Sequence, residues 1–154
     1  MKQSVQRVIS ALAEHDIRVT PTEFAESTRT AADAAAAIGT TVGQIVKSLV
    51  FMHDLRPILL LVSGPNRVDV SAVGKRLGMT LERASADQVR AATSFSIGGV
   101  APVGHPILLP TWIDVDLMSY ELVWAAAGTP NTVFPISPEE LRRITGAEVL
   151  EMGG

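Results

Sequence analysis

The sequence predicts an α+β fold: one domain over residues 1–154, with short helices around a mixed, mostly antiparallel and partly barrel-like sheet. Three observations support this prediction. The length of 154 residues is that of one domain. The composition, 47% hydrophobic and 19% charged, is typical of a globular protein. Helical and strand patterns are also mixed along the chain in an irregular order, which favours one α+β domain.

The first half of the chain begins with two predicted helices. An amphipathic helix that ends near residues 15–16 is expected from apolar residues at helical spacing: Val5, Val8, Ile9 and Leu12. The alanine-rich segment "TAADAAAAIG" predicts a second helix, with Thr30 as its N-cap and Gly39 as its end. Strand patterns follow at 45–52 and 58–62, and the turn-like "HDLRP" between them predicts a hairpin.

The second half continues with short elements. Helices are expected at 70–77, ended by Gly78, and at 85–92, where Ser85 and Gln88 have the spacing of a capping box. Four strand patterns follow, in "ILLP", "WIDVD", "LVWAAAG" and "VFPI". The last helix is predicted to start after the N-cap Ser137, with Glu140 completing a capping box.

The composition excludes several classes of protein. The chain has 13 Lys and Arg against 16 Asp and Glu, so any contact with RNA must be local. It has no cysteine, which excludes disulfides, thiol nucleophiles and cysteine-based metal sites. The three histidines show no metal-ligand spacing, so neither a metal nor another cofactor is expected. No apolar run is long enough to span a bilayer, and we expect a soluble, cytoplasmic protein without a membrane partner.

Lys47 lies within the predicted strand "QIVKSLVF". In an alternating strand it shares a face with Ile45, Leu49 and Phe51, among apolar side chains. One interpretation is a lysine at a strand edge whose stem packs on its neighbours while its ammonium reaches water. The other is an ammonium that faces a cleft and meets an anion or a polarised carbonyl of a ligand.

The glycine- and proline-rich stretch "GGVAPVGHP" is the second unusual feature. A surface turn would explain its residues, since glycines adopt positive φ and prolines stiffen a loop. Alternatively, Gly98 and Gly99 let a ligand approach the backbone, while Pro102 and Pro106 hold exposed N–H groups toward one point. Such a loop can build an oxyanion hole without charged side chains.

Several segments in this order resemble the YbaK/EbsC family, which is related to the editing domain of bacterial prolyl-tRNA synthetases. The resemblance covers residues 30–149 and rests on "TAADAAAAIG", "QIVKSLVF", "IGGVAPVGHP", "WAAAGTPNTVF" and "ISPEELRRITGA". It implies one α+β domain that removes a wrong amino acid from the 3′-terminal ribose of a tRNA, often the tRNA for proline. Thr22 and Phe24 stand where some relatives carry a tyrosine that lines the pocket, which leaves the edited amino acid open.

The resemblance also implies roles for individual residues. The family's strand lysine matches Lys47, and its G-x-x-x-P loop matches Gly98, Gly99, Val100, Ala101 and Pro102. Lys47 would hold the terminal nucleotide or stabilise negative charge, and the loop would supply backbone donors and confine the amino acid. Further candidates for substrate contacts, each with a simple structural alternative as a turn, cap or exposed loop residue, are Gly104, His105, Asn66, Arg67, Gly128 and Thr129.

Two functions are therefore compatible with the sequence. The first is a free-standing aminoacyl-tRNA deacylase that hydrolyses the ester of a mischarged tRNA, for example tRNA for proline carrying alanine, cysteine or another small amino acid. A synthetase partner could deliver the tRNA, because the acidic net charge predicts weak binding of RNA. The second is a binding module that holds an aminoacyl nucleotide or small ligand without turnover, or docks on a synthetase or another regulator.

Overall fold

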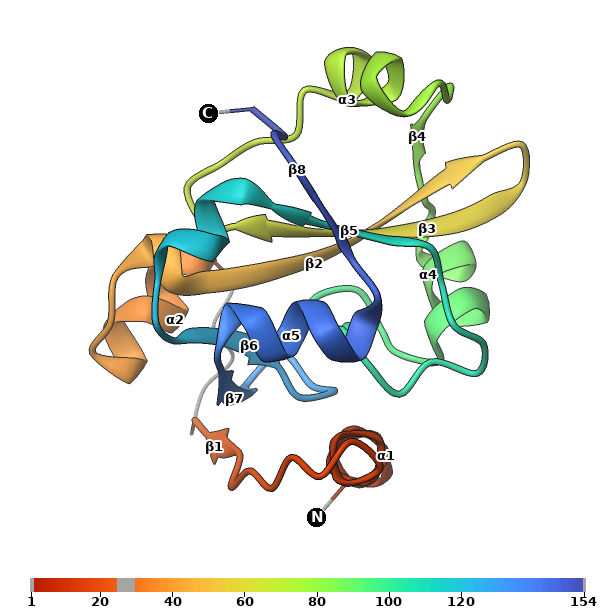
Figure 1. The fold of residues 1–154 in the computed structure, drawn as a ribbon. Coiled ribbons are helices and arrows are strands. Elements are labelled where there is room, and N and C mark those ends of the chain that lie inside the picture. The colour runs from red at the N-terminus through yellow and green to blue at the C-terminus, as the bar shows by residue number, and fades with distance from the viewer. Residues whose placement is uncertain (1, 25–29, 154) are drawn as a thin grey trace.

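Five helices cover the faces and edges of one sheet (Figure 1). The computed structural model describes residues 2–24 and 30–153. Its helices are α1 (Gln3–Ala13), α2 (Ala31–Ile38), α3 (Val70–Leu77), α4 (Ala86–Thr93) and α5 (Pro138–Thr145). Two short 3-10 helices, η1 (Val42–Gln44) and η2 (Val115–Ser119), were not predicted.

The helix caps follow the predicted local chemistry with one exception. The Thr30 hydroxyl accepts a hydrogen bond from the Asp33 N–H at 3.0 Å, and Gly39 ends α2 in the left-handed conformation. Ser85 and Gln88 form the predicted capping box of α4. At α5, however, the Glu140 carboxylate binds the Arg143 guanidinium instead of the backbone of Ser137, so the predicted capping box is only half formed.

The sheet is mixed, as predicted, with antiparallel pairs in the majority. Its strands are β1 (Thr22–Glu23), β2 (Ile45–His53), β3 (Arg56–Ser63), β4 (Glu82–Arg83), β5 (Thr111–Asp114), β6 (Val123–Ala126), β7 (Thr132–Ile136) and β8 (Glu148–Leu150). The order is β1-β7-β6-β2-β3-β5-β8, and β4 pairs with the outer end of β2. The terminal strands β1 and β8 do not pair, so within the described residues the sheet is open and the expected partial barrel is not formed.

The central hairpin is formed by β2 and β3, which pair in antiparallel register from Val46 opposite Ser63 to His53 opposite Arg56. Its two-residue turn is Asp54–Leu55, and both residues have positive φ, 48° and 64°. This conformation matches the right-handed twist of the strands but normally favours glycine. The hairpin was predicted, although its turn residues are unusual.

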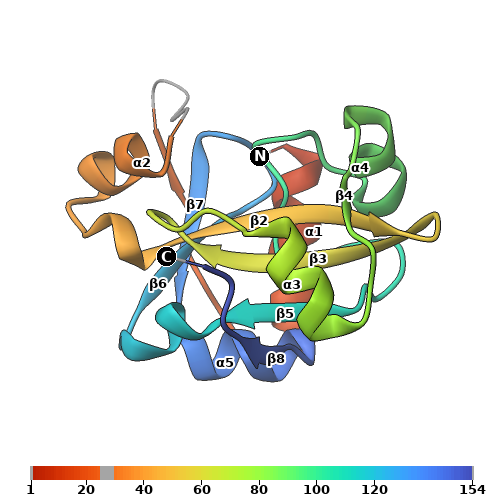
Figure 2. The ribbon, with the colours of Figure 1, turned by 90° about the horizontal axis from the view of Figure 1, so that it is seen from above.

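Side chains of β3 alternate between two separate parts of the core. Leu59 and Leu61 pack on the face that α1 and α5 cover, whereas Leu60 and Val62 pack on the face under α3. Figure 2, seen from above, shows α3 across the hairpin, α1 behind it, and α5 next to β8. Because burial of one such side chain contributes about 1.5–3 kcal/mol, this strand is a main source of stability. It also sets the position of β2 beside it.

One predicted strand is wrong, and three short strands were missed. Residues 107–110 form an irregular segment in which Ile107 is 65% and Leu108 is 80% exposed. Pro106 precedes the segment and Pro110 ends it, and both lack an N–H group, which disfavours strand pairing. The missed strands, β1, β4 and β8, contain two or three residues each, too few to show an alternating pattern.

The strained turn provides a test of the hairpin. Leu55 is 87% exposed, so its side chain contributes little packing, and its φ of 64° suits glycine better. Leu55→Gly should therefore raise the free energy of unfolding by about 1 kcal/mol in urea titrations. Leu55→Ala keeps the strain and should change stability by less than about 0.5 kcal/mol. Equal stability of the two variants would contradict the described turn.

Candidate functional site

The middle of β2 has an open edge. On the side away from β3, β2 pairs with β6 only at Ile45 and Val46, and with β4 only at Phe51 and Met52. Between these pairings no described strand lies beside residues 47–49 on the edge away from β3. A strand edge inside a sheet exposes backbone donors and acceptors as well as side chains of both faces. This gap is the candidate site.

A cavity of about 290 Å³ lies along this open edge. Most of its described lining is apolar or small, with Lys47 as its only charged side chain. The lining residues are Thr30, Ala31, Ala34, Ile45, Val46, Lys47, Ser48, Leu49, Ile97, Gly98, Val100, Trp124, Ala126, Pro130 and Val133. We call it the Lys47 cavity. A smaller hollow of about 190 Å³ adjoins it and shares five lining residues: Ser48, Leu49, Ile97, Gly98 and Val100.

The Lys47 ammonium is held by the chain that follows β3. It donates a hydrogen bond to the backbone carbonyl of Asn66, which leaves two of its three N–H donors for other partners. Asn66 is itself only 7% exposed, and its side-chain amide donates to Asp114 at 2.9 Å and to Asp116 at 2.6 Å. The ammonium therefore has a defined position at the border of the cavity, unlike a lysine that extends freely into water.

A buried carboxylate anchors this arrangement. Asp114, at the end of β5, is 1% exposed, and its oxygens accept hydrogen bonds from the backbone N–H groups of Ser63 and Asp116 at 3.0 Å each. With the amide of Asn66 it has three donors, which compensate the loss of hydration. The segment 63–66 is thus tied to β5. Sequence reasoning missed Asp114, whose only signal was an aspartate at the end of an apolar strand.

The surroundings lower the pKa of Lys47. Partial burial is the main cause, since it disfavours the charged amine, and the positive charges of Arg67 and Arg83 act in the same direction. The negative charge of Asp114 opposes them. Arg67 itself is exposed, so it acts on Lys47 through its charge from the rim of the site.

The glycine-rich loop meets the cavity through its first residues. Gly98 and Val100 line the cavity, and Gly98 has a φ of 89° that favours glycine. Within the described residues no hydrogen bond engages the N–H groups of Gly98 and Val100. The Gly99 N–H instead donates to Ser96, and a Cβ on Gly99 would lie 3.0 Å from the Thr129 Cα. Gly99 therefore permits close packing of two loops and does not open the cavity to a ligand.

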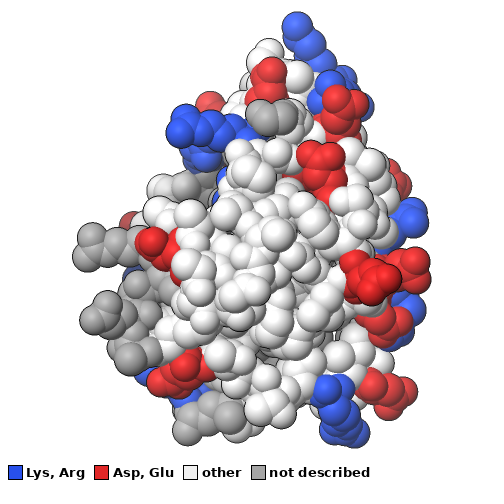
Figure 3. All heavy atoms as spheres, turned by 90° about the vertical axis from the view of Figure 1, so that its left-hand side faces the viewer, with Lys and Arg blue, Asp and Glu red and all other residues white. Residues whose placement is uncertain are grey.

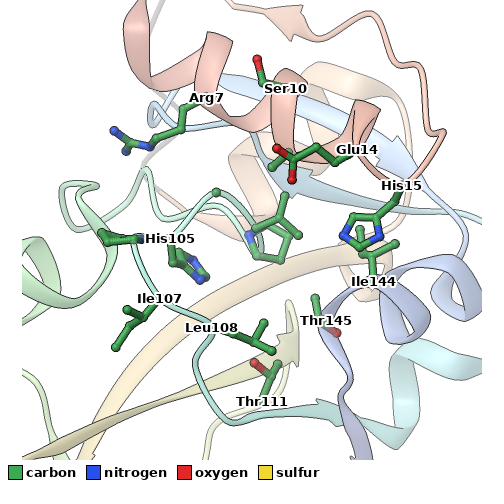
Figure 4. A pocket seen from close by; sticks show the side chains of 15 residues that line it. Arg7, Ser10, Glu14, His15, His105, Ile107, Leu108, Thr111, Ile144 and Thr145 are labelled. Carbon is green, nitrogen blue, oxygen red and sulfur yellow. The ribbon is translucent and has the colours of Figure 1, made fainter.

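The later loop residues face a different pocket. Pro102, Gly104 and His105 line a hollow of about 400 Å³ between the loop, α1 and α5, shown in Figure 4. None of its lining residues belongs to the Lys47 cavity. We call it the His105 pocket. The fold thus divides the predicted site: Lys47, Gly98 and Val100 come together, while Pro102, Gly104 and His105 do not join them.

His105 is half-buried and engaged. Its Nε2–H donates to the Ala101 carbonyl at 2.7 Å, and its ring meets the Phe95 ring edge-on at 6.0 Å between centroids. Burial lowers its pKa, the hydrogen bond to Ala101 opposes this shift, and the charge of Arg7 adds to it. The expectation that His105 is a solvent-exposed loop residue is therefore wrong. Its contacts with Ala101 and Phe95 stabilise the loop.

The remaining predicted residues support the loops. Ala101 is fully buried. Gly128 has a φ of 100°, and a Cβ there would lie 2.7 Å from the Ser4 carbonyl oxygen of α1. The Thr129 hydroxyl hydrogen-bonds Asn131 at 2.9 Å and Thr132 at 2.5 Å. Gly128 and Thr129 thus lie behind Gly99 and shape the cavity wall from outside.

Surface charge around the site is uneven. The face on which α2 lies is largely uncharged at its centre, with Lys, Arg, Asp and Glu at its rim (Figure 3). The basic residues of α3 and α5 lie on opposite faces of the sheet, so the fold does not gather them into one strip. Within residues 2–24 and 30–153, no helix has the length and hydropathy to cross a membrane, and no three His, Asp or Glu side chains cluster as metal ligands.

Comparison with known proteins relates this geometry to a family. The family model "Aminoacyl-tRNA editing domain" matches residues 25–144. YwhH of Bacillus subtilis, an uncharacterized protein, is 30% identical over 129 residues, with coverage of 83% of this chain and 82% of YwhH. EbsC of Enterococcus faecalis, a candidate Cys-tRNA(Pro)/Cys-tRNA(Cys) deacylase, is 23% identical, with coverage of 98% and 96%.

A solved structure is similar over the whole chain. The crystal structure of a candidate trans-editing enzyme for prolyl-tRNA synthetase is 44% identical and superimposes with a TM-score of 0.95. The match covers 100% of this chain and 99% of that one.

The electrostatics of Lys47 can be tested directly. Arg67→Gln removes a positive charge that lowers the pKa of Lys47, so this pKa should rise, measurable by NMR titration of ¹³C-methylated lysines. Arg56→Gln, at the far end of the hairpin, should leave it unchanged. Because the pKa of Lys47 is lower in the folded state than in the unfolded state, the unfolded state binds the proton more readily. The free energy of unfolding of the wild-type protein should therefore decrease as the pH falls from 10.5 through the folded pKa. An unchanged pKa in Arg67→Gln would contradict the described surroundings.

Proposed function

The chain belongs to the aminoacyl-tRNA editing domain family, and from this premise we propose that it is a trans-acting deacylase that hydrolyses the ester of a mischarged tRNA. The observation that supports the proposal is the Lys47 cavity. It combines one positioned ammonium, free backbone N–H groups and a small apolar space at an open strand edge. These are the groups that an aminoacyl ester requires for binding and charge stabilisation.

Each group has a role in the reaction. A water attacks the ester carbonyl, negative charge develops on the carbonyl oxygen, and the bond to the ribose oxygen breaks as that oxygen takes up a proton. Of the expected loop donors, the N–H groups of Gly98 and Val100 are available to the oxyanion, whereas the Gly99 N–H is engaged by Ser96. The Lys47 ammonium, with two donors left, holds the terminal phosphate or stabilises the same charge.

In this mechanism the substrate and water carry out the proton transfers. The described lining of the Lys47 cavity includes no His, Asp or Glu. We therefore assign the proton transfers to the hydroxyl group of the terminal ribose and to water, while the protein positions the reacting groups. Positioning with oxyanion stabilisation is a sufficient mechanism for an ester, which is intrinsically labile.

The size of the cavity favours a small amino acid. About 290 Å³ must hold the side chain and part of the ribose, and the walls are formed by residues such as Val46, Val100 and Trp124. Alanine, cysteine or serine on the tRNA for proline are the substrates we propose. Because the chain has a net charge of −3 and the basic residues of α3 and α5 lie on opposite faces of the sheet, we also propose that a synthetase delivers the tRNA.

A binding module without turnover remains the second candidate. The same ammonium and N–H groups would hold an aminoacyl nucleotide, and the absence of an acid–base side chain in the described lining favours this alternative. Turnover separates the two functions. A binding module would protect the ester, whereas a deacylase would release the amino acid.

A panel of charged tRNAs tests the proposal. We expect release of at least one amino acid from tRNA for proline charged with alanine, cysteine or serine, while correctly charged prolyl-tRNA persists. Lys47→Ala should lower kcat/KM by about 100-fold, because it removes a positioned charge. Lys75→Ala, an exposed lysine of α3, is the matched control and should keep full activity.

Two outcomes would count against the deacylase. If every ester in the panel persisted, the binding module would be favoured. If Lys47→Ala kept the full rate and became more stable, Lys47 would be a strand-edge lysine without a catalytic function. Circular dichroism of each variant verifies that the fold is intact.

A further inference from the structure

Ser48 is an unexplained polar residue in the wall of the Lys47 cavity. Its hydroxyl oxygen is buried, and it has no hydrogen-bond partner within the described residues. Buried polar groups are nearly always hydrogen-bonded, because loss of hydration without compensation costs free energy. Ser48 lines both the cavity and the smaller hollow beside it. A buried hydroxyl without a hydrogen-bond partner in the wall of a cavity indicates that a ligand group forms the missing hydrogen bond.

The backbone of Ser48 is open to the same space. In an antiparallel pair, successive residues direct their N–H and C=O alternately toward and away from the partner strand. Val50 directs its C=O away from β3, because this oxygen accepts from the Ala84 N–H at 3.2 Å. Ser48, two residues earlier, therefore also directs its N–H and C=O away from β3, into the gap between β6 and β4.

No described strand forms hydrogen bonds with the N–H and C=O groups of Ser48. The parallel register of β2 with β6 ends at Val46 opposite Ala125, two residues before Ser48. The pairing with β4 begins only at Phe51. Within the described residues no hydrogen bond engages the Ser48 N–H or C=O. Ser48 thus presents one backbone donor and one carbonyl acceptor to the gap, and its unpartnered hydroxyl lies buried in the cavity wall.

These groups match one part of an aminoacyl ester. Its α-ammonium group needs acceptors, and the described lining offers no carboxylate. Lys47 repels a second cation, so it suits the phosphate or the carbonyl oxygen instead. The carbonyl and hydroxyl oxygens of Ser48, on the neighbouring residue, are acceptors that no described donor engages, so they can bind the ammonium.

We propose that Ser48 binds the free α-amino group of the esterified amino acid through its carbonyl and hydroxyl oxygens. The assignment rests on the proposed function and specifies its substrate class: esters with an unblocked amino group. Acetylation replaces an ammonium with three donors by a neutral amide with one, and it places an acyl group against the strand edge. N-acylated aminoacyl-tRNA, including peptidyl-tRNA, is thereby excluded.

Binding of stable analogues tests this assignment without any turnover. The probes are 3′-deoxy-3′-aminoadenosine linked by an amide to alanine, to N-acetylalanine or to lactate. With the wild-type protein, calorimetry should show at least about 10-fold tighter binding of the alanyl analogue than of the acetylated one, because a charge-assisted hydrogen bond is lost. The lactyl analogue, without the positive charge, should bind with intermediate strength.

Variants of Ser48 assign the preference to this residue. Ser48→Ala removes the hydroxyl acceptor and should reduce the preference for the free amino group several-fold, whereas Ser48→Thr keeps the hydroxyl and should retain it. Ser71→Ala, an exposed serine of α3, is the control. Equal binding of the alanyl and acetylated analogues, no binding of the alanyl analogue, or an unchanged preference in Ser48→Ala would each overturn the assignment.

The outcomes separate this inference from the proposed function. If no charged tRNA is hydrolysed but the alanyl analogue still binds preferentially, the deacylase fails and the role of Ser48 stands. If alanyl-tRNA and N-acetylalanyl-tRNA are hydrolysed at the same rate, the deacylase stands and the role of Ser48 fails.

Discussion

The hydrogen bond from the Lys47 ammonium to the Asn66 carbonyl is the interaction on which the candidate site depends. It is maintained by the buried Asp114, which accepts from the Asn66 amide and from the backbone of Ser63. A hydrogen bond to a charged group contributes about 1.5–3 kcal/mol, and Asp114 accepts three of them, so the support is strongly held in place. A stiff support holds a charged group in one place, which electrostatic stabilisation of a reacting ester requires.

The cavity next to Lys47 forms where the sheet is interrupted. Neighbouring strand residues point to opposite faces, so Lys47 and Ser48 would normally be separated by the sheet. Because β6 and β4 leave the edge of β2 away from β3 unpaired in its middle, a ligand at this edge can contact side chains of both faces and the backbone between them. The start of the glycine-rich loop, at Gly98, lies across the gap and forms the opposite wall.

Local patterns in the sequence predicted most elements of the fold but only part of the site. Caps such as Thr30 and the alternation of β2 depend on nearby residues, so they were predictable. The support of Lys47 joins residues separated by 19 and 48 positions, and no local pattern reveals such pairs. His105 was grouped with Lys47 because of its loop, yet the loop reverses and places it on another pocket. The open edge of β2 lies between the ends of its pairings with β6 and β4. The sequence of β2 alone does not show where these pairings end.

The central claim is that the acylated end of a tRNA binds in the Lys47 cavity and not in the His105 pocket. Amide NMR during titration with the alanyl analogue of the terminal adenosine tests it most directly. The account predicts that the largest shifts occur at Ser48, Gly98 and Val100, and that Gly104 and Thr145 remain unaffected. Shifts confined to Gly104, Thr145 and their neighbours would contradict it, since the ligand would then occupy the other pocket.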